Sequence, residues 1–386
     1  MIYLDNNSTT PLHPKVKEII KDTLDYYFNP SSVYTDGRVV REKINDVRKE
    51  IAAFLNCKPN EIIFTSCGSE SNNTILKGVV NHYLKDGSKN KLHIITSSIE
   101  HPSVINTLKY IESESIEVTY LNVDKNGMIN IEELRKSIKK ETILISIMFA
   151  NNEIGTIEPI EDISKIALEN NILFHTDAVQ AIGKVDIDLQ KIKVDYLSLS
   201  GHKIYAPKGV GVIFKREGSI PICPLINGGH QENGERAGTE NIIGIIALGE
   251  AFRMLKLEMK EEIEKVRELR DLLENEIIKN IPDVKINGHP TMRLAGTLNV
   301  SFKKIEGESI LLKLDLNGIA VSTGSACSSG SLDPSPVIMA LGVPPEIAHS
   351  SIRFSLGREN TEEEILKTVE ILKESVEFLR AISPIK

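Results

Sequence analysis

A lysine and an aspartate in the middle of the chain have the residue types and the spacing for amine and carbonyl chemistry. Asp177 ends the apolar segment 172–177, and Lys203 follows 26 residues later, at the end of the run SLSGHK (198–203). Two strands that end in these residues, joined by a helix-length connection, are what a pyridoxal phosphate site requires. The lysine amine forms a Schiff base with the cofactor aldehyde, and the carboxylate keeps the pyridinium nitrogen protonated. An isolated lysine is usually a surface residue, but the matching aspartate favours the cofactor site.

A phosphate site is predicted where a helix begins after a strand at 61–65. Gly68 and Ser69 open that helix. Backbone N–H groups at a helix N-terminus, a serine hydroxyl and a glycine that permits close approach all suit a phosphate group. The same Gly-Ser pair is also an ordinary N-cap, so this motif alone is a weak signal.

Three further polar residues follow predicted strands at their carboxyl ends, where open parallel sheets bind ligands. His101 follows a strand at 92–96 and could lie over the pyridine ring, although a single histidine there is more often structural. Asn152 follows a strand at 142–149 and fits a turn equally well. Gln180 lies three residues after the aspartate and could reach the ring hydroxyl. Together these strand ends indicate one cofactor pocket more strongly than any single motif does.

The elements that must position these residues alternate between strands and helices from about residue 38 to 255. This β–α–β order implies a largely parallel sheet with helices on both faces, which is the α/β class. Apolar spacing predicts helices at 38–56 and 71–84, and strands at 61–65, 92–96, 142–149, 172–176, 195–199 and 209–215.

A second, smaller α+β unit is predicted after a long helical stretch at 241–281. We therefore expect a large cofactor-binding domain at 15–255 and a small domain formed by 1–14 and 256–386. The predicted elements of the small domain are strands at 298–302, 319–323 and 351–356 and helices at 307–316 and 361–381.

The composition argues against several classes of function. With 46 Lys and Arg against 54 Asp and Glu, the net charge of −8 does not favour binding to nucleic acid. No apolar run reaches the roughly 18 to 20 residues of a membrane span, and no signal peptide is evident at the N-terminus. The four cysteines show no Cys-x-x-Cys spacing. We therefore expect a cytoplasmic protein with reduced thiols.

These motifs belong to a longer series that resembles the group I cysteine desulfurases, the NifS/IscS-like family of fold-type I pyridoxal phosphate enzymes. The series runs in order from residue 3 to 357, so the resemblance covers essentially the whole chain. It implies a mainly parallel sheet in a large domain and a smaller α+β domain that carries a catalytic cysteine. The matching motifs lie at residues 3–11, 64–72, 100–101, 151–155, 177–180, 200–203, 236–239, 324–329 and 350–357.

The resemblance implies a role for each residue around the cofactor. Lys203 corresponds to the Schiff-base lysine, Asp177 to the partner of the ring nitrogen, and Gln180 to the partner of the phenolic oxygen. His101 corresponds to a histidine that stacks on the ring and moves protons, and Asn152 to a residue beside the cofactor and the substrate. The implied phosphate ligands are Gly68, Ser69, Ser200 and His202.

The resemblance also implies an obligate homodimer with composite sites, because Thr239 would reach the phosphate in the neighbouring subunit. One departure from the family pattern is the run 67–69, which reads Cys-Gly-Ser where many relatives have Gly-Ala-Thr. This departure places an extra thiol beside the predicted phosphate site. We interpret Cys67 as a tolerated small residue rather than a second nucleophile.

Cys327 lies in the segment 322–334, whose sequence STGSACSSGSLDP is small, polar and typical of a loop. Such neighbours would bury a thiol poorly, whereas Cys57 and Cys223 are interpreted as inert buried cysteines. In the family this thiol reacts as a thiolate with the sulfur of bound cysteine, which gives a persulfide and alanine. His101 is its nearest proton acceptor in the family pattern. Some relatives also use this cysteine as a transient ligand of an iron–sulfur cluster, which stays open for Cys327.

Arg353, in the predicted strand 351–356, corresponds to the residue that binds the substrate carboxylate through its guanidinium fork. The structural alternative is a buried ion pair. The resemblance thus implies a cysteine desulfurase that passes sulfur from L-cysteine to acceptors, with an iron–sulfur scaffold protein as the expected partner. Three alternatives remain: a selenocysteine lyase, a fold-type I aminotransferase in which Cys327 is incidental, and a non-catalytic protein that keeps the fold.

Overall fold

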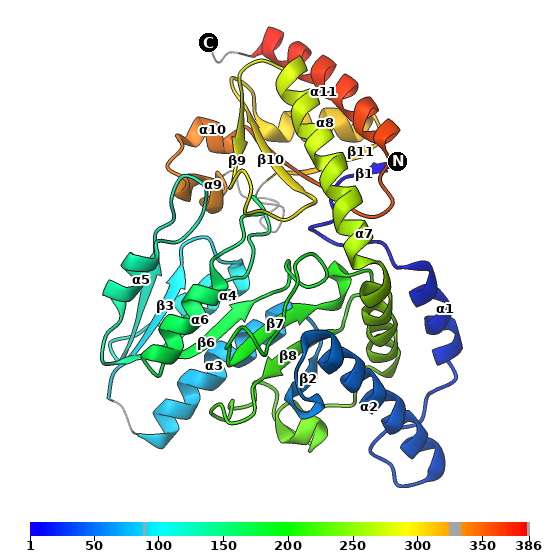
Figure 1. Ribbon diagram of the computed structural model, residues 1–386, viewed down its shortest axis with the longest axis vertical. Coiled ribbons are helices and arrows are strands. Elements are labelled where there is room, and N and C mark those ends of the chain that lie inside the picture. Colours follow the sequence, from blue (N-terminus) through cyan, green and yellow to red (C-terminus); the bar gives the residue numbers. More distant parts are fainter. Residues whose placement is uncertain (88–89, 324–332, 384–386) are drawn as a thin grey trace.

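The computed structural model describes residues 1–87, 90–323 and 333–383 (Figure 1). Within this part of the chain, the larger sheet has the strand order β2-β8-β7-β6-β5-β3-β4. Strand β8 runs antiparallel to β2 and β7, and all other neighbouring strands are parallel. The strands are β2 (Ile62–Thr65), β3 (Leu92–Ser97), β4 (Ile116–Leu121), β5 (Thr142–Ser146), β6 (Leu173–Asp177), β7 (Tyr196–Ser200) and β8 (Gly211–Lys215). The predicted mainly parallel sheet is confirmed.

Helices cover both faces of this sheet because alternate residues of each strand point to opposite faces. Ile62 and Phe64 pack in the core beneath α2, α6 and the first half of α7, whereas Ile63 packs in a second cluster with α3 and α4. The helices of this part are α1 (Pro14–Thr23), α2 (Thr35–Leu55), α3 (Gly68–Asp86), α4 (Pro102–Ile111), α5 (Ile131–Ser137), α6 (Ile160–Glu169) and α7 (Ile242–Asn280).

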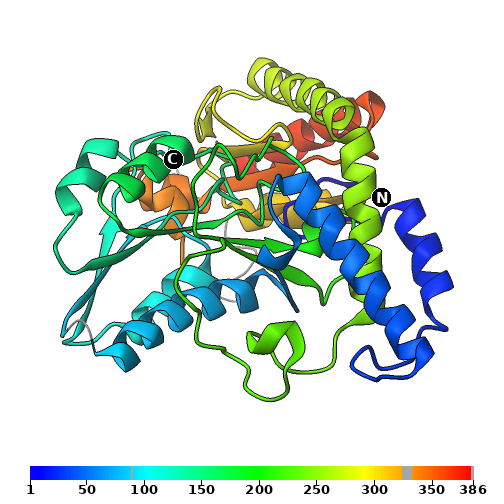
Figure 2. The same ribbon diagram turned by 60° about the horizontal axis from the view of Figure 1, so that its bottom comes forward.

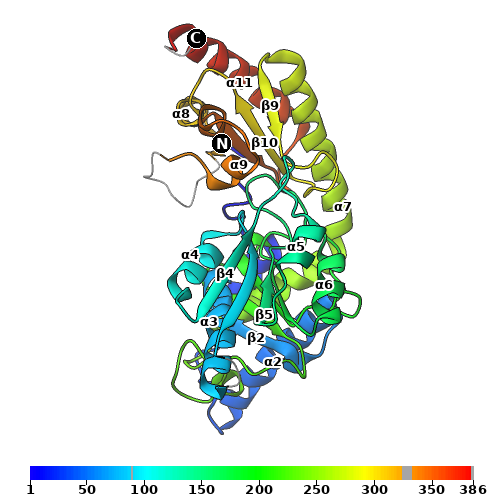
Figure 3. The ribbon, with the colours of Figure 1, turned by 90° about the vertical axis from the view of Figure 1, so that its left-hand side faces the viewer.

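The long helix α7 leads to a smaller antiparallel sheet with the order β12-β13-β10-β9. Figure 2 shows yellow-green α7 beside red α11, and Figure 3 shows α7 extending along both parts of the molecule. The remaining elements are β1 (Ile2–Tyr3), β9 (Val284–Asn287), β10 (Thr297–Phe302), α8 (Gly307–Leu316), β11 (Ile319–Ala320), β12 (Ser322–Thr323), α9 (Pro336–Ala340), α10 (Pro345–His349), β13 (Ser351–Ser355) and α11 (Glu362–Ile382).

The small part has its own apolar core, to which α7 contributes Leu273 and Ile277. One expectation for this part is wrong, because residues 319–323 do not form a single strand. Strand β11 pairs with β1, whereas β12 pairs with β13, so the two pieces belong to different sheets. The first residues of the chain thereby join the C-terminal half. The domain bounds given above stay a prediction.

Candidate active site

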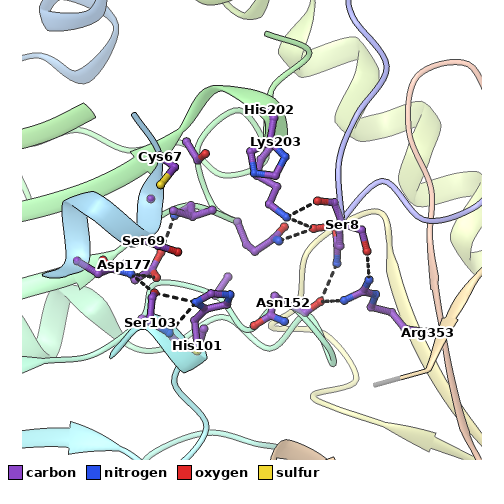
Figure 4. Close-up of a pocket in the computed structure, with 18 residues that line it drawn as sticks. Ser8, Cys67, Ser69, His101, Ser103, Asn152, Asp177, His202, Lys203 and Arg353 are labelled. Atoms are coloured by element: carbon purple, nitrogen blue, oxygen red, sulfur yellow. Dashed lines mark hydrogen bonds between the residues drawn. The ribbon is translucent and has the colours of Figure 1, made fainter. Parts of the chain in front are cut away.

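A cavity of about 350 Å³ lies beyond the carboxyl ends of the parallel strands (Figure 4). Thr239 is exposed and lies outside the lining of this cavity, and Cys327 lies outside the residues that the structure describes. The cavity brings together ten residues that the sequence analysis singled out for cofactor or substrate: Gly68, Ser69, His101, Asn152, Asp177, Gln180, Ser200, His202, Lys203 and Arg353.

A single helical turn after β7 carries Lys203 into this cavity. Its Nζ donates to the backbone carbonyls of Asn7, at 2.5 Å, and Ser8, at 2.6 Å. Gln180 Nε2 donates to the same Asn7 carbonyl over 2.9 Å. The side chain of Asn7 is also fixed, because its Nδ2 donates to Thr297 Oγ1 at 2.9 Å. The N-terminal segment therefore forms one wall of the site and fixes the lysine amine.

Asp177 ends β6 with a carboxylate that is 5% exposed. Its Oδ2 accepts a hydrogen bond from Asn72 Nδ2 at 2.7 Å, and its Oδ1 accepts one from the backbone N–H of Val179 at 3.0 Å. Two donors from different elements therefore fix the direction of the carboxylate. A buried acceptor in this position can pair with a protonated nitrogen of a ligand.

His101 is the N-cap of α4, and its Nδ1 contacts the backbone N–H of Ser103 at 3.1 Å and Ser103 Oγ at 2.7 Å. Burial lowers the pKa of the imidazole from its ordinary value, and the charge of Lys203 lowers it further, against the opposing effect of Asp177. The histidine therefore favours its neutral form at neutral pH.

The N-terminus of α3 lies at the other end of the cavity, where Cys67 is the N-cap. A Cβ at position 68 would lie 2.6 Å from Cγ2 of Val179, so Gly68 lets the helix begin close to the end of β6. Ser200 Oγ is buried and has no hydrogen-bond partner among the described residues. Burial and then Lys203 lower the pKa of His202 to about 4. These groups form a cradle that suits an anion.

Arg353 reaches the cavity from β13 of the small sheet and is 2% exposed. Its Nη2 donates to Asp5 Oδ1 and to Ser8 Oγ, both at 2.7 Å, and its Nη1 donates to the carbonyl of Asn152 at 3.1 Å. The buried ion pair that was the structural alternative is therefore present. The same guanidinium also lines the cavity, and its buried Nε has no partner among the described residues.

The model of the family described as aminotransferase class-V matches residues 2–367. The chain belongs to this family. A cysteine desulfurase IscS from Dictyoglomus turgidum is 50% identical over 386 residues, covering 100% of this chain and 97% of the relative. A solved NifS-like protein has a TM-score of 0.91 and 39% identity, covering 98% of this chain and 100% of its own. SspA, solved in complex with cysteine, has a TM-score of 0.82 and 36% identity. The match covers 94% of this chain and 100% of SspA.

The resemblance to the NifS/IscS-like, fold-type I enzymes is thus confirmed. Class-V aminotransferases use pyridoxal phosphate, so the predicted cofactor is confirmed as well. The residues that line the cavity fit pyridoxal phosphate on structural grounds. The buried hydroxyl Ser200 Oγ, which has no hydrogen-bond partner in the described part of the chain, and the helix N-terminus at Gly68 suit its phosphate. A buried carboxylate, Asp177, and an amine, Lys203, line the same cavity and suit its ring nitrogen and its aldehyde.

Several residues of this site were not identified from the sequence. Asn7 and Ser8 lie in the N-terminal motif, which signalled the family without indicating a contact with Lys203. Asn72 lies four residues after Gly68 on α3, so helical spacing places it on the same face and could have identified it. Ser103 lies two residues after His101, which is the range of local side-chain contacts at a helix start.

Proposed function

We propose that this chain is a pyridoxal phosphate-dependent cysteine desulfurase that converts L-cysteine to L-alanine and transfers the sulfur through a persulfide on Cys327. The observation that carries the proposal is the single cavity that holds an amine, a buried carboxylate, an anion cradle and a guanidinium. The names and full-length similarity of the relatives support the same reaction.

The cofactor, when bound, withdraws electrons from the substrate α carbon and so stabilises the charge that develops there. In the proposed site, Asp177 would pair with the ring nitrogen and Gln180 would donate to the phenolic oxygen. The phosphate would be held at the start of α3 by the N–H groups of Gly68 and Ser69, with Ser200 and His202 as further ligands. Lys203 Nζ would bind the cofactor aldehyde and would take the α-proton of the substrate, because it is the amine that lines the described cavity.

Arg353 binds and orients the substrate α-carboxylate in this proposal. A guanidinium offers a planar fork of donors that matches a carboxylate, and its Nε–H is buried without a partner among the described residues. Asn152, whose carbonyl accepts from the same guanidinium, lies beside the substrate. The contacts that hold the guanidinium would therefore fix the place at which the substrate carboxylate binds.

The sulfur transfer assigned to Cys327 balances without an external oxidant. A bond forms between Sγ of the thiolate and the sulfur of the substrate, while the bond between that sulfur and the substrate β carbon breaks. The electron pair of the broken bond stays with the carbon skeleton, which takes up a proton and leaves as alanine. Only the thiolate form of the cysteine reacts in this way. The role of Cys327 rests on the family resemblance, because its position lies outside the described residues.

The experiment that tests the proposal measures sulfide and alanine released from L-cysteine, with dithiothreitol as the acceptor. The wild type should release both in equal amounts, and Cys327→Ala should release neither. Cys223→Ala is the matched control, since Cys223 lies outside the lining of the cavity, and it should keep the activity. Equal activity in wild type and Cys327→Ala would exclude the mechanism. Turnover of selenocysteine without Cys327, or turnover that depends on a keto acid, would indicate the lyase or the aminotransferase.

We also propose that the enzyme is a cytoplasmic homodimer that delivers sulfur to an iron–sulfur scaffold protein. Thr239, expected to serve the neighbouring subunit, is exposed and lies outside the cavity of its own chain. Large apolar side chains, including Tyr27 and Val33, are also exposed. Among the described residues, no helix has the length and apolar character to cross a membrane. Light scattering should give about twice the 42.9 kDa of one chain.

A further inference from the structure

Three turns of this chain share the sequence His-Pro-X and the same hydrogen bond. They begin at His13, His101 and His289. In each turn Nδ1 of the imidazole lies within hydrogen-bond distance of the backbone N–H two residues later, at 3.1, 3.1 and 3.2 Å respectively. A backbone N–H can only donate, so Nδ1 must be the acceptor. A neutral imidazole that accepts at Nδ1 carries its proton on Nε2.

The turn at His13 gives an independent check of this reasoning. Its Nε2 lies 3.3 Å from a carboxylate oxygen of Glu258. A carboxylate accepts hydrogen bonds, so this contact requires a proton on Nε2, which is the tautomer that the Nδ1 contact with the backbone N–H of Lys15 also requires. The contacts of Nδ1 and Nε2 therefore require the same tautomer of His13.

The turn at His101 has an additional chain of side-chain donors behind Nδ1 (Figure 4). Asn72 Nδ2 donates to Asp177 Oδ2 over 2.7 Å and to Ser103 Oγ over 2.9 Å. Because Ser103 Oγ accepts that hydrogen bond, its own proton is directed to His101 Nδ1, which lies 2.7 Å away. Nδ1 therefore accepts from two donors of the same residue, and the direction of every hydrogen bond in the chain is determined.

We propose that Ser103, supported by Asn72, is a positioning residue that holds His101 as the Nε2–H tautomer in the cofactor cavity. This inference rests on the proposed function and refines it. In this tautomer Nε2 has no free electron pair, so it donates a hydrogen bond into the cavity and cannot take a proton from the substrate or from an approaching thiol. Removal of the α-proton is then left to Lys203.

Burial has the largest effect on the pKa of His101, and the two nearby charges act in opposite directions. Burial and the ammonium of Lys203 lower the pKa of the imidazole, while Asp177 opposes them. Glu100, its chain neighbour, is buried, and burial raises the pKa of that carboxyl well above its ordinary value. The other titratable residues of the cavity lining are Cys67, His202 and Arg353. The neutral imidazole on which the tautomer depends is therefore the favoured form at neutral pH.

The test is nitrogen NMR of the cofactor-loaded protein labelled with ¹⁵N-histidine, without cysteine. Protonated and unprotonated imidazole nitrogens have well-separated shifts, and His101→Gln assigns the signals by their loss. The wild type should show a neutral ring with the proton on Nε2 at pH 7 to 8. In Ser103→Ala the Nδ1 signal should shift, and the pH midpoint of its protonation should rise by about half a unit to one unit, because one donor to the neutral form is lost.

Two further variants make the result specific. Ser103→Thr keeps the hydroxyl and should restore the wild-type Nδ1 signal. Lys15→Ala changes the equivalent position of the His13 turn, where the side chain donates to Glu18, and should leave the His101 signals unchanged. An Nδ1–H ring or an imidazolium in the wild type at pH 7 to 8 would overturn the inference, as would identical Nδ1 signals in wild type and Ser103→Ala.

The test separates this inference from the proposed function, because the spectrum requires no turnover. If the Nε2–H ring is observed but cysteine gives no alanine, the proposed function alone fails. If alanine is formed by an enzyme whose His101 carries its proton on Nδ1, the inference alone fails.

Discussion

Lys184 Nζ donates to Oε1 of Gln180 over 2.9 Å and thereby decides which end of that amide faces the cofactor cavity. A backbone carbonyl can only accept, so Nε2 of Gln180 must face Asn7, to which it donates, and the amide oxygen must face Lys184. The same ammonium also donates to Asn7 Oδ1 at 3.1 Å. Burial lowers the pKa of Lys184 to about 7. The lysine behind the cavity therefore makes Gln180 a donor at the proposed cofactor oxygen.

Lys184→Met should reduce alanine formation about tenfold, because the amide of Gln180 loses the contact that orients it. The pH dependence of the cofactor absorption should shift as well, since the donor to the phenolic oxygen is no longer fixed. Lys191→Met, at a side chain that is 73% exposed, is the control and should behave as the wild type. A spectrum and rate for Lys184→Met equal to those of Lys191→Met would contradict this role.

Lys203→Ala should abolish alanine formation and the covalent attachment of the cofactor. Treatment of the wild type with borohydride should fix the cofactor to Lys203, which mass spectrometry of peptides can locate. Lys208→Ala, an exposed lysine nearby in sequence, should leave the labelling unchanged. Label on Lys184, another amine close to Gln180, would show that the wrong lysine had been assigned.

Arg353→Lys should lower kcat/KM for L-cysteine about a hundredfold, mainly through KM, because an ammonium cannot reproduce the guanidinium fork. The variant should also unfold at a lower temperature, since the bonds to Asp5 and Ser8 are disturbed. Arg358→Lys is the control, because it disturbs a different ion pair, with Glu258, outside the lining of the cavity. It should leave KM unchanged. An unchanged KM in Arg353→Lys would leave Arg353 with only its structural ion pair.

Glu158→Gln should stabilise the protein at alkaline pH. Burial raises the pKa of this carboxyl from 4.5 to about 8, and its Oε2 accepts from the backbone N–H of Ile129 at 3.1 Å. A carboxyl whose pKa is raised in the folded state contributes stability below pH 4.5, and this contribution is lost as the pH rises through about 8. The glutamine does not titrate, so the variant should gain on the order of 2 kcal/mol over the wild type at pH 8.5.

The midpoint of urea unfolding at pH 4.5 and pH 8.5 measures this effect. Glu161→Gln, at an exposed position on α6, is the control and should follow the wild type at both pH values. If Glu158→Gln and the wild type differ equally at the two pH values, then the carboxyl does not titrate between them.

The fold class could be predicted from the sequence because the candidate cofactor-binding residues follow the ends of predicted strands. The rule that parallel strands present their carboxyl ends at one edge placed Asp177, Ser200 and His101 in one cavity. Strand β4 was not predicted, because its partly exposed residues lack the apolar run of its neighbours. The roles assigned to the site residues stay predictions.

Contacts between distant segments could not be predicted, because no local pattern encodes them. Lys184 reaches Asn7 across 177 positions of the chain, and the sequence offered no reason to connect them. Residues 319–323 look like one strand but divide between two sheets, since their partners come from opposite ends of the chain. In both cases tertiary pairing, rather than local propensity, decided the outcome.

The contact between Arg353 and Asp5 joins residues that are 348 positions apart. The wall of the cavity that holds Lys203 is therefore completed only when the segment at residues 5–8 meets strand β13. A chain still emerging from the ribosome has the cofactor-facing strands before it has the guanidinium that would select a substrate. Such long-range closure is a late and slow event in folding. The order of synthesis thus delays a complete cavity until β13 has been made and has paired with the segment at residues 5–8.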